Sequence, residues 1–292
     1  MKNRKITLGW FLRNAFLWFI VFIMLFPLLH MISVSLSDNL SVMQSKVVFL
    51  PKNFTLDVYK HVLSQKMIYT AYKNTLLYVI VGTVASLFVL VTGSYALSKK
   101  RCPLGKQLNI LILITMFFSG GMIPAYLAIK WLNMLDTIWA VTLPSALTAY
   151  NLIIMRSFFA QYPAEIEESG KLDGLNDIGV LWYLVLPTST AVLATIGLFC
   201  AVGYWNSFFT PLIYLQNDSK YPLQIILRQI VMQSVMTNEM AMPASEAGKD
   251  IRFAEDSIKY ATILVSIVPI IVVYPFLQKY FVKGVMIGSV KG

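Results

Sequence analysis

The chain has 292 residues, of which 57% are hydrophobic and only 13% are charged, and its formal net charge is +10. Soluble domains carry roughly 25% charged residues, so the composition predicts a polytopic membrane protein rather than a soluble domain. No basic run is interleaved with aromatic residues, so the charge does not indicate nucleic acid; in membrane proteins it marks cytoplasmic flanks and contact with anionic lipids.

Apolar stretches in the first half of the chain predict three membrane helices, each long enough for the roughly 20 residues of a crossing. They are residues 12–36, 72–98 and 107–130. The polar segment 37–71 is predicted to be an external loop. The second span ends at the basic run 99–101, with Lys106 close behind, and such a short basic loop predicts the cytoplasmic side. Gly120 and Gly121, in the third span, allow either close helix packing or a local break.

The second half of the chain predicts three more spans, at residues 137–157, 188–215 and 258–280. An uncharged run of about 40 residues precedes Asp218, which is too long for one crossing and too short for two. Pro187 divides it into an interfacial helix over 178–186 and the fifth span. Residues 216–257 are a second external loop. No repeat or linker is visible, so residues 1–292 are expected to form a single domain with both termini in the cytoplasm.

An acidic loop, residues 161–187, lies between the fourth and fifth spans. Five of the chain's 14 acidic residues fall in it: Glu165, Glu167, Glu168, Asp173 and Asp177. Pro163 suits the first position of a helix, and glutamates after it favour the positive end of the helix dipole. Gly174 can take the left-handed conformation that ends a helix, and Asn176 or Asp177 can cap a second one. The loop is therefore predicted to be a helix-turn-helix outside the bilayer.

The sequence shows no catalytic or nucleotide-binding pattern. There is no Walker A sequence and no H-E-x-x-H, and the two histidines, His30 and His61, lie far apart. Cys102 and Cys200 are too few for a disulfide framework or a metal site. No span carries the run of ionisable residues that ion-driven pumps place in the membrane. We expect a translocator energised by another subunit, with no cofactor or metal of its own; an ion-coupled secondary carrier and a membrane enzyme are the alternatives.

The order Glu168-Ser169-Gly170-x-x-Asp173-Gly174, followed by Leu184-x-Leu186-Pro187, resembles the E-A-A-x-x-D-G…I-x-L-P loop of type I, binding-protein-dependent ABC importer permeases. Within that family it is similar to the second permease subunit of maltose-type and larger-oligosaccharide importers. Ser169 and Gly170 replace the alanines of the motif, and Ala191 replaces a frequent later proline. The replacements are small residues, which leave room for close docking.

This resemblance implies an all-α integral membrane protein with six transmembrane helices and a cytoplasmic helix-turn-helix coupling loop. It implies a sugar or oligosaccharide importer in a bacterial cell membrane, in which the chain pairs with a second, different permease. Two ATPase subunits would carry ATP and Mg, and an extracytoplasmic sugar-binding protein would deliver the substrate. Docking to the ATPase is assigned to these residues of the acidic loop: Glu167, Glu168, Ser169, Gly170, Asp173, Gly174, Leu186 and Pro187.

Two further segments resemble functional parts of the same family. Tyr204, Trp205 and Asn206 are similar to a W-N-x-F stretch, where an amide suits sugar hydroxyls and an indole can stack on a sugar; helix–helix hydrogen bonding and an interfacial aromatic belt are the alternative. The tail, with Lys283, Gly284 and Gly288, resembles one that reaches towards the ATPases, although a frayed tail facing lipid is also compatible. The loop at 216–257 would meet the binding protein or remain an amphipathic surface segment.

Overall fold

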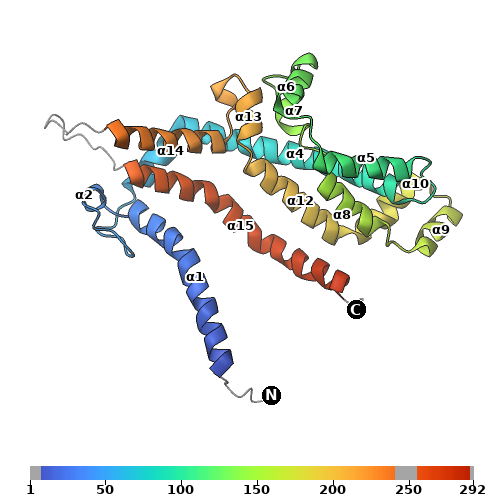
Figure 1. Ribbon diagram of the computed structural model, residues 1–292, viewed down its shortest axis with the longest axis horizontal. Helices are drawn as coiled ribbons and strands as arrows, with labels where there is room; N and C mark the ends of the chain where they lie inside the picture. The colour runs from blue at the N-terminus through green and yellow to red at the C-terminus, as the bar shows by residue number, and fades with distance from the viewer. Residues whose placement is uncertain (1–7, 241–254, 290–292) are drawn as a thin grey trace. The chain divides into compact units, whose positions relative to one another are not determined.

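A computed structural model describes residues 8–240 and 255–289, and in these ranges all regular secondary structure is helical (Figure 1). The longer helices are α1 (Leu8–Ser35), α4 (Lys66–Ser98), α5 (Gly105–Phe117), α8 (Ala149–Phe159), α12 (Thr190–Trp205), α14 (Leu223–Met240) and α15 (Glu255–Ser289). The shorter ones are α2 (Asn39–Met43), α3 (Asp57–Ser64), α6 (Met122–Trp131), α7 (Ile138–Thr142), α9 (Ala164–Leu172), α10 (Asp177–Gly179), the π-helical η1 (Val180–Val185), α11 (Leu186–Thr188), α13 (Phe209–Tyr214) and the 3-10 helix η2 (Asp218–Lys220).

The chain divides into two compact units, and each is described by itself. The first contains Met1–Tyr69 and Leu227–Val268, and the second contains Thr70–Ile226 and Pro269–Gly292. The acidic loop lies entirely within the second unit.

Three continuous helices are long and apolar enough to cross a membrane: Leu12–Ser35, Lys66–Ser98 and Glu255–Val273. Two bent helix pairs raise this number to five if each pair counts as one span. One of them is the expected span 107–130, which is not a single straight helix: α5 and α6 meet at 118°. The break falls at the paired glycines, where Gly121 has φ +87°, a conformation that helical residues do not adopt.

The expected fourth and fifth spans are also interrupted rather than single continuous helices. Residues 137–157 form α7 and α8, separated by an irregular segment around Pro144, which cannot donate a backbone hydrogen bond to a helix. Residues 188–215 form α12 and α13, because Pro211 has no N–H for the carbonyl of Ser207. The helical segment Asp177–Thr188 joins α12 at a bend of 86°, so the turn falls at Ser189, two residues after Pro187.

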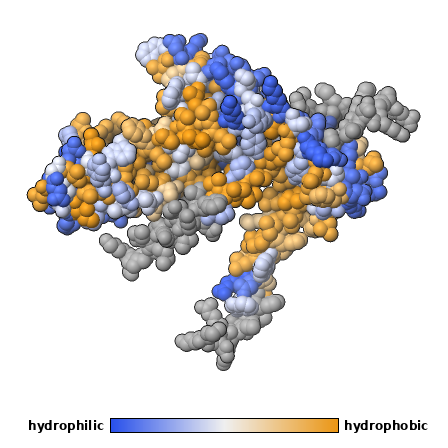
Figure 2. Space-filling view, turned by 180° about the vertical axis from the view of Figure 1, so that it is seen from behind, coloured by the Kyte–Doolittle hydropathy of each residue, from blue (hydrophilic) through white to orange (hydrophobic). Residues whose placement is uncertain are grey.

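The expected external loop 37–71 contains α2, α3 and the start of α4. In the first unit, its chain folds back on the end of α1. Ser33 Oγ donates to the Phe49 carbonyl at 2.6 Å, and the Thr55 N–H donates to the Leu36 carbonyl at 3.0 Å. Most large apolar side chains along the rest of α1 are exposed, and hydrophobic residues make up much of the surface visible in Figure 2.

The core of the second unit lies between α4, α8, η1 and α12. Its fully buried members include Leu90, Leu152, Met155, Phe159 and Ile196. The same cluster contains Val180, Leu181 and Val185 of η1, so it continues into the acidic loop. The loop is therefore anchored to α4, α8 and α12 through apolar packing, whose burial contributes roughly 1.5–3 kcal/mol for each large side chain.

Candidate functional site in the acidic loop

Helix α9 ends in a Schellman motif built on a glycine. Gly174 has φ +88°, its N–H donates to the Lys171 carbonyl at 3.0 Å, and the Leu175 N–H donates to the Gly170 carbonyl at 2.9 Å. These are the two hydrogen bonds of that motif, so the predicted helix end at Gly174 is confirmed. Pro163 occupies the N-cap position, one residue before the position that the sequence predicted.

The second helix of the acidic loop begins at a side-chain cap. Asn176 Oδ1 accepts a hydrogen bond from the Gly179 N–H at 2.7 Å, so of the two predicted capping residues Asn176 performs the role. The base of the loop is closed by the Tyr162 hydroxyl, which donates to the Leu184 carbonyl at 3.2 Å. Thr188 Oγ1 donates to the same carbonyl at 2.8 Å. The beginning and the end of the acidic loop are thereby held together before Ser189.

The packing of α9 against η1 depends on the absence of a side chain at Gly170. This glycine is buried, and a Cβ atom added to it would lie 2.5 Å from Leu184 Cδ1 and 3.4 Å from Leu175 Cδ1. Such a short separation requires Leu184 to move. The family motif has alanine at this position. Glycine here allows α9 and η1 to approach each other very closely.

A largely buried ion pair joins the acidic loop to the end of α4. The Lys99 ammonium contacts Glu167 Oε1, and the two side chains are only 16% and 13% exposed. The same ammonium lies 4.1 Å from the centroid of the Tyr95 ring, which adds a cation–π contact. Glu167 is thus directed into its own chain, whereas the sequence assigned it to docking. A separation of 68 residues hides this partner from sequence patterns.

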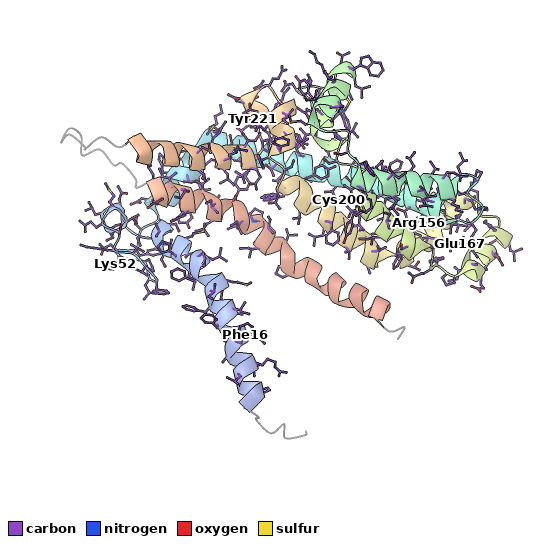
Figure 3. The ribbon with its side chains drawn as sticks, viewed as in Figure 1. Phe16, Lys52, Arg156, Glu167, Cys200 and Tyr221 are labelled. Carbon is purple, nitrogen blue, oxygen red and sulfur yellow. The ribbon has the colours of Figure 1, made fainter. Side chains whose placement is uncertain are left out.

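A second set of basic residues holds the start of α10. Arg101 pairs with Asp177, and Lys171 Nζ lies 3.3 Å from Asp177 Oδ1. The hydrogen bond from Arg101 lowers the pKa of Asp177, so the carboxylate is ionised and able to pair with both basic residues at neutral pH. Arg156 Nε donates to the Leu97 carbonyl at 3.1 Å and ties α8 to α4; Figure 3 labels Arg156 and Glu167 near the acidic-loop end of the second unit.

The outer face of the acidic loop has a different character from its base. A shallow groove of about 310 Å³ lies between α9 and η1, lined by Glu165, Ile166, Ser169, Gly170, Asp173, Leu175 and Leu184. Glu168 and Asp173 are exposed, and neither forms an ion pair within the described ranges 8–240 and 255–289. Leu172 is 90% exposed, and Ile178 and Trp182 are exposed nearby in the loop. Carboxylates beside exposed apolar side chains suit a partner with basic and apolar groups.

The residues predicted to line a substrate path separate into two kinds. Tyr204 is buried, donates to the Thr142 carbonyl at 2.8 Å and shares a 3.0 Å hydrogen bond with Ser86 Oγ. Trp205 is buried as well, whereas Asn206 is exposed at the C-terminal end of α12. Tyr204 thus fits the helix–helix alternative.

In the tail, Lys283, Gly284 and Gly288 lie outside the residues whose side chains are described, as do residues 241–254 of the outer loop.

At the opposite end of α4 a carboxylate organises the backbone around it. Asp136, at φ +57°, accepts hydrogen bonds from the N–H groups of Gln216 (3.1 Å) and Asn217 (3.2 Å) and from Lys220 Nζ. Its own N–H donates to the Tyr214 carbonyl at 2.8 Å. The α6–α7 turn is thereby joined to the segment that follows α13.

The start of α4 completes this second contact region. Asn74 Nδ2 donates to the carbonyls of Ser219 (2.8 Å) and Tyr221 (3.1 Å), and the Tyr78 hydroxyl donates to that of Lys220 at 2.8 Å. At 1.5 Å per residue, about 37 Å of helix separates position 74 from Lys99, slightly more than the roughly 30 Å hydrocarbon core. Polar contacts therefore lie at both ends of a segment with membrane-spanning length.

Comparison with known proteins yields full-length matches, although no protein-family model matches the chain. It is 41% identical over 293 residues to the polygalacturonan/rhamnogalacturonan transport system permease protein YtcP of Bacillus subtilis (strain 168), with 100% of each protein covered. It is 43% identical over 270 residues to protein LplC of the same strain, covering 92% of this chain and 90% of that protein. A chain in the crystal structure of a bacterial ABC transporter that imports the acidic polysaccharide alginate is similar with a TM-score of 0.87 and 33% identity, covering 96% of this chain and 99% of that one.

Proposed function

The chain belongs to the ABC transporter permeases of sugar import systems, and from this premise we propose that its acidic loop is the site where a separate ATPase docks and drives transport. The observation that carries the proposal is the contrast between the two faces of the loop. Its inner face is fixed to α4, α8 and α12 by a shared core and by the Lys99–Glu167 ion pair. Its outer face presents carboxylates that have no ion-pair partner among the described residues, beside exposed apolar side chains.

This arrangement can transmit a displacement. A force applied to α9 reaches η1 through the close contact at Gly170 and reaches the end of α4 through Glu167. Packed interiors are dense and transmit strain, so the three helices that share this core would move with the loop. The docking face consists of Glu168, Ser169 and Asp173 together with Leu172, while Gly170, Gly174 and the segment 186–187 give the loop its shape.

The proposal places the acidic loop, the basic run 99–101 and both termini in the cytoplasm. ATP and Mg would be held by two ATPase subunits, and this chain would supply half of the translocation path beside a second, different permease. A sugar-binding protein would approach from the outside, near the contact region around Asp136. ATP hydrolysis would reside in the partner subunits, and no cofactor would be bound by this chain.

The substrate class that we propose is an acidic oligosaccharide. The 41% identical relative is named for polygalacturonan and rhamnogalacturonan transport, and the similar solved structure belongs to an importer of the acidic polysaccharide alginate. The exposed amide of Asn206 can hydrogen-bond to sugar hydroxyls in neutral and in acidic oligosaccharides alike. Galacturonate oligomers, delivered by the cognate binding protein, should therefore stimulate ATP hydrolysis by the reconstituted transporter, and neutral malto-oligomers of the same length should not.

The docking role is tested by reversing one exposed charge. Glu168→Lys should abolish ATP-driven uptake and copurification of the ATPase, while the subunit still inserts with its partner permease. Asp218→Lys, the same change at an exposed carboxylate of the opposite region, serves as the matched control and should leave ATPase binding unchanged. Normal ATPase binding by Glu168→Lys would count against docking, and uptake by this chain alone, driven by an ion gradient in liposomes, would support a secondary carrier instead.

A further inference from the structure

A second concave surface lies behind the acidic loop and is strongly basic. It is a pocket of about 350 Å³ formed where the end of α4, the start of α5 and the end of α8 meet. Four cationic side chains line it: Lys99, Lys100, Lys106 and Arg156. We propose that this basic pocket binds the phosphate headgroup of an anionic phospholipid, a role that goes beyond docking of the ATPase.

The charges in the basic pocket are only partly compensated by the protein. Lys99 is paired with Glu167, and Arg156 uses Nε to reach the Leu97 carbonyl. Lys100 and Lys106 are exposed, and neither pairs with a carboxylate in the described part of the chain. Like charges gathered in one concave surface repel one another, and an anion with several acceptor oxygens relieves that repulsion.

The apolar wall of the pocket indicates the kind of anion. Ile110 lines the pocket and is 52% exposed, and the same helix continues with the exposed side chains of Leu111, Ile114 and Phe117. The α5–α6 pair is apolar enough to count as a membrane span. A ligand with an anionic head and hydrocarbon chains would pair with the basic side chains of the pocket and cover the apolar face of α5. Inorganic phosphate would fill only the polar part, and an acidic peptide would leave the face of α5 uncovered.

The position of the pocket gives the bound lipid a physical consequence. Its cationic groups include Lys99, so a phosphate there lies beside the ion pair that joins the acidic loop to α4. Neutralising Lys100 and Lys106 lowers the repulsion in the short turn between α4 and α5. The lipid would thereby stabilise the inner face of the acidic loop without occupying its outer face.

The test measures lipid retained by the complete transporter, extracted from nanodiscs that contain equal parts of phosphatidylglycerol and phosphatidylcholine. Native mass spectrometry should show phosphatidylglycerol retained selectively by the wild type. Each lysine near a membrane surface contributes about 1 kcal/mol, so Lys100→Gln with Lys106→Gln should weaken retention about 10- to 30-fold. Replacing both with arginine should preserve it, and Lys46→Gln with Lys130→Gln, an equal change of charge at exposed sites elsewhere, should have no effect.

Three results would overturn the proposal. The first is equal retention by the double glutamine variant and the Lys46/Lys130 control. The second is displacement of the lipid by millimolar inorganic phosphate, which would identify a soluble anion as the ligand. The third is retention by the separated permease pair but not by the complete transporter, which would assign the pocket to an acidic segment of the ATPase. Because the readout is lipid mass, these results are independent of whether Glu168 docks the ATPase.

Discussion

An ion pair lies near each end of α4, and the two pairs differ in burial and in the segments that they join. At one end, Lys99 and Glu167 are 16% and 13% exposed and lie against the core that α4 shares with α8, η1 and α12. At the other, Lys220 and Asp136 are 42% and 28% exposed, and the carboxylate also accepts two backbone N–H groups. Both pairs join segments far apart in sequence, but the first ties the acidic loop to the end of α4, whereas the second holds the α6–α7 turn against the segment that follows α13.

This difference indicates that the acidic loop passes force to α4, whereas the region around Asp136 holds the backbone in place. The acidic loop has a fixed inner face and an outer face whose carboxylates remain unpaired within the described chain, as expected of an element that receives force from a partner. The region around Asp136 uses its polar groups internally, through hydrogen bonds to α4 and to the segment 214–221. Variants at the first end should therefore affect coupling, and variants at the second should affect stability.

The largest effect is expected from Gly174→Pro. Proline fixes φ near −65°, whereas Gly174 has φ +88° and donates its N–H to the Lys171 carbonyl. The Schellman motif cannot form, so ATP-driven uptake should fall to background while membrane insertion persists. Gly174→Asn, which tolerates the left-handed conformation, should retain most of the uptake and serves as the control. Uptake assays measure transport, and the amount of the subunit in membrane fractions measures insertion. Uptake at the wild-type level by the proline variant would show that transport does not need the Schellman motif.

A charge exchange distinguishes an internal role of Glu167 from a docking role. Removing one partner of a buried ion pair costs about 3–5 kcal/mol, and partial exposure reduces this cost here. Lys99→Glu and Glu167→Lys should each reduce uptake and ATPase coupling severely, and the double exchange should restore much of both. If Glu167 contacted the ATPase instead, the double variant would remain as defective as Glu167→Lys alone.

The smallest effect is expected at the opposite end, with Asp136→Asn. The hydrogen bond from Lys220, followed by those from Gln216 and Asn217, lowers the pKa of Asp136, so its stabilising contribution is complete above the unfolded value of about 3.9 and is lost as pH falls through the folded pKa. The variant should lose roughly 1–2 kcal/mol near pH 7. Its thermal unfolding midpoint should approach that of the wild type below about pH 4, and its ATPase binding should be unchanged. A constant difference in midpoint across this range would refute the electrostatic explanation.

Local signals in the sequence predicted the acidic loop well. Gly174 and Asn176 act through hydrogen bonds to neighbours within a few residues, so their helix-ending and helix-capping roles could be inferred from residue type and spacing. The Lys99–Glu167 and Asp136–Lys220 pairs join positions 68 and 84 residues apart, and no periodicity relates them. The helix breaks at residues 118–121 and 143–148 depend on glycine and proline, whose presence permits a break but does not require one.

The central claim is that the outer face of the acidic loop meets a separate ATPase, and site-specific photocrosslinking in the assembled transporter tests it most directly. A photoreactive residue in place of Leu172, which is 90% exposed, should crosslink to the ATPase. The same residue in place of the exposed Asn217, at the opposite end of α4, should not. Crosslinking of position 172 to the extracytoplasmic binding protein, or of position 217 to the ATPase, would contradict the account.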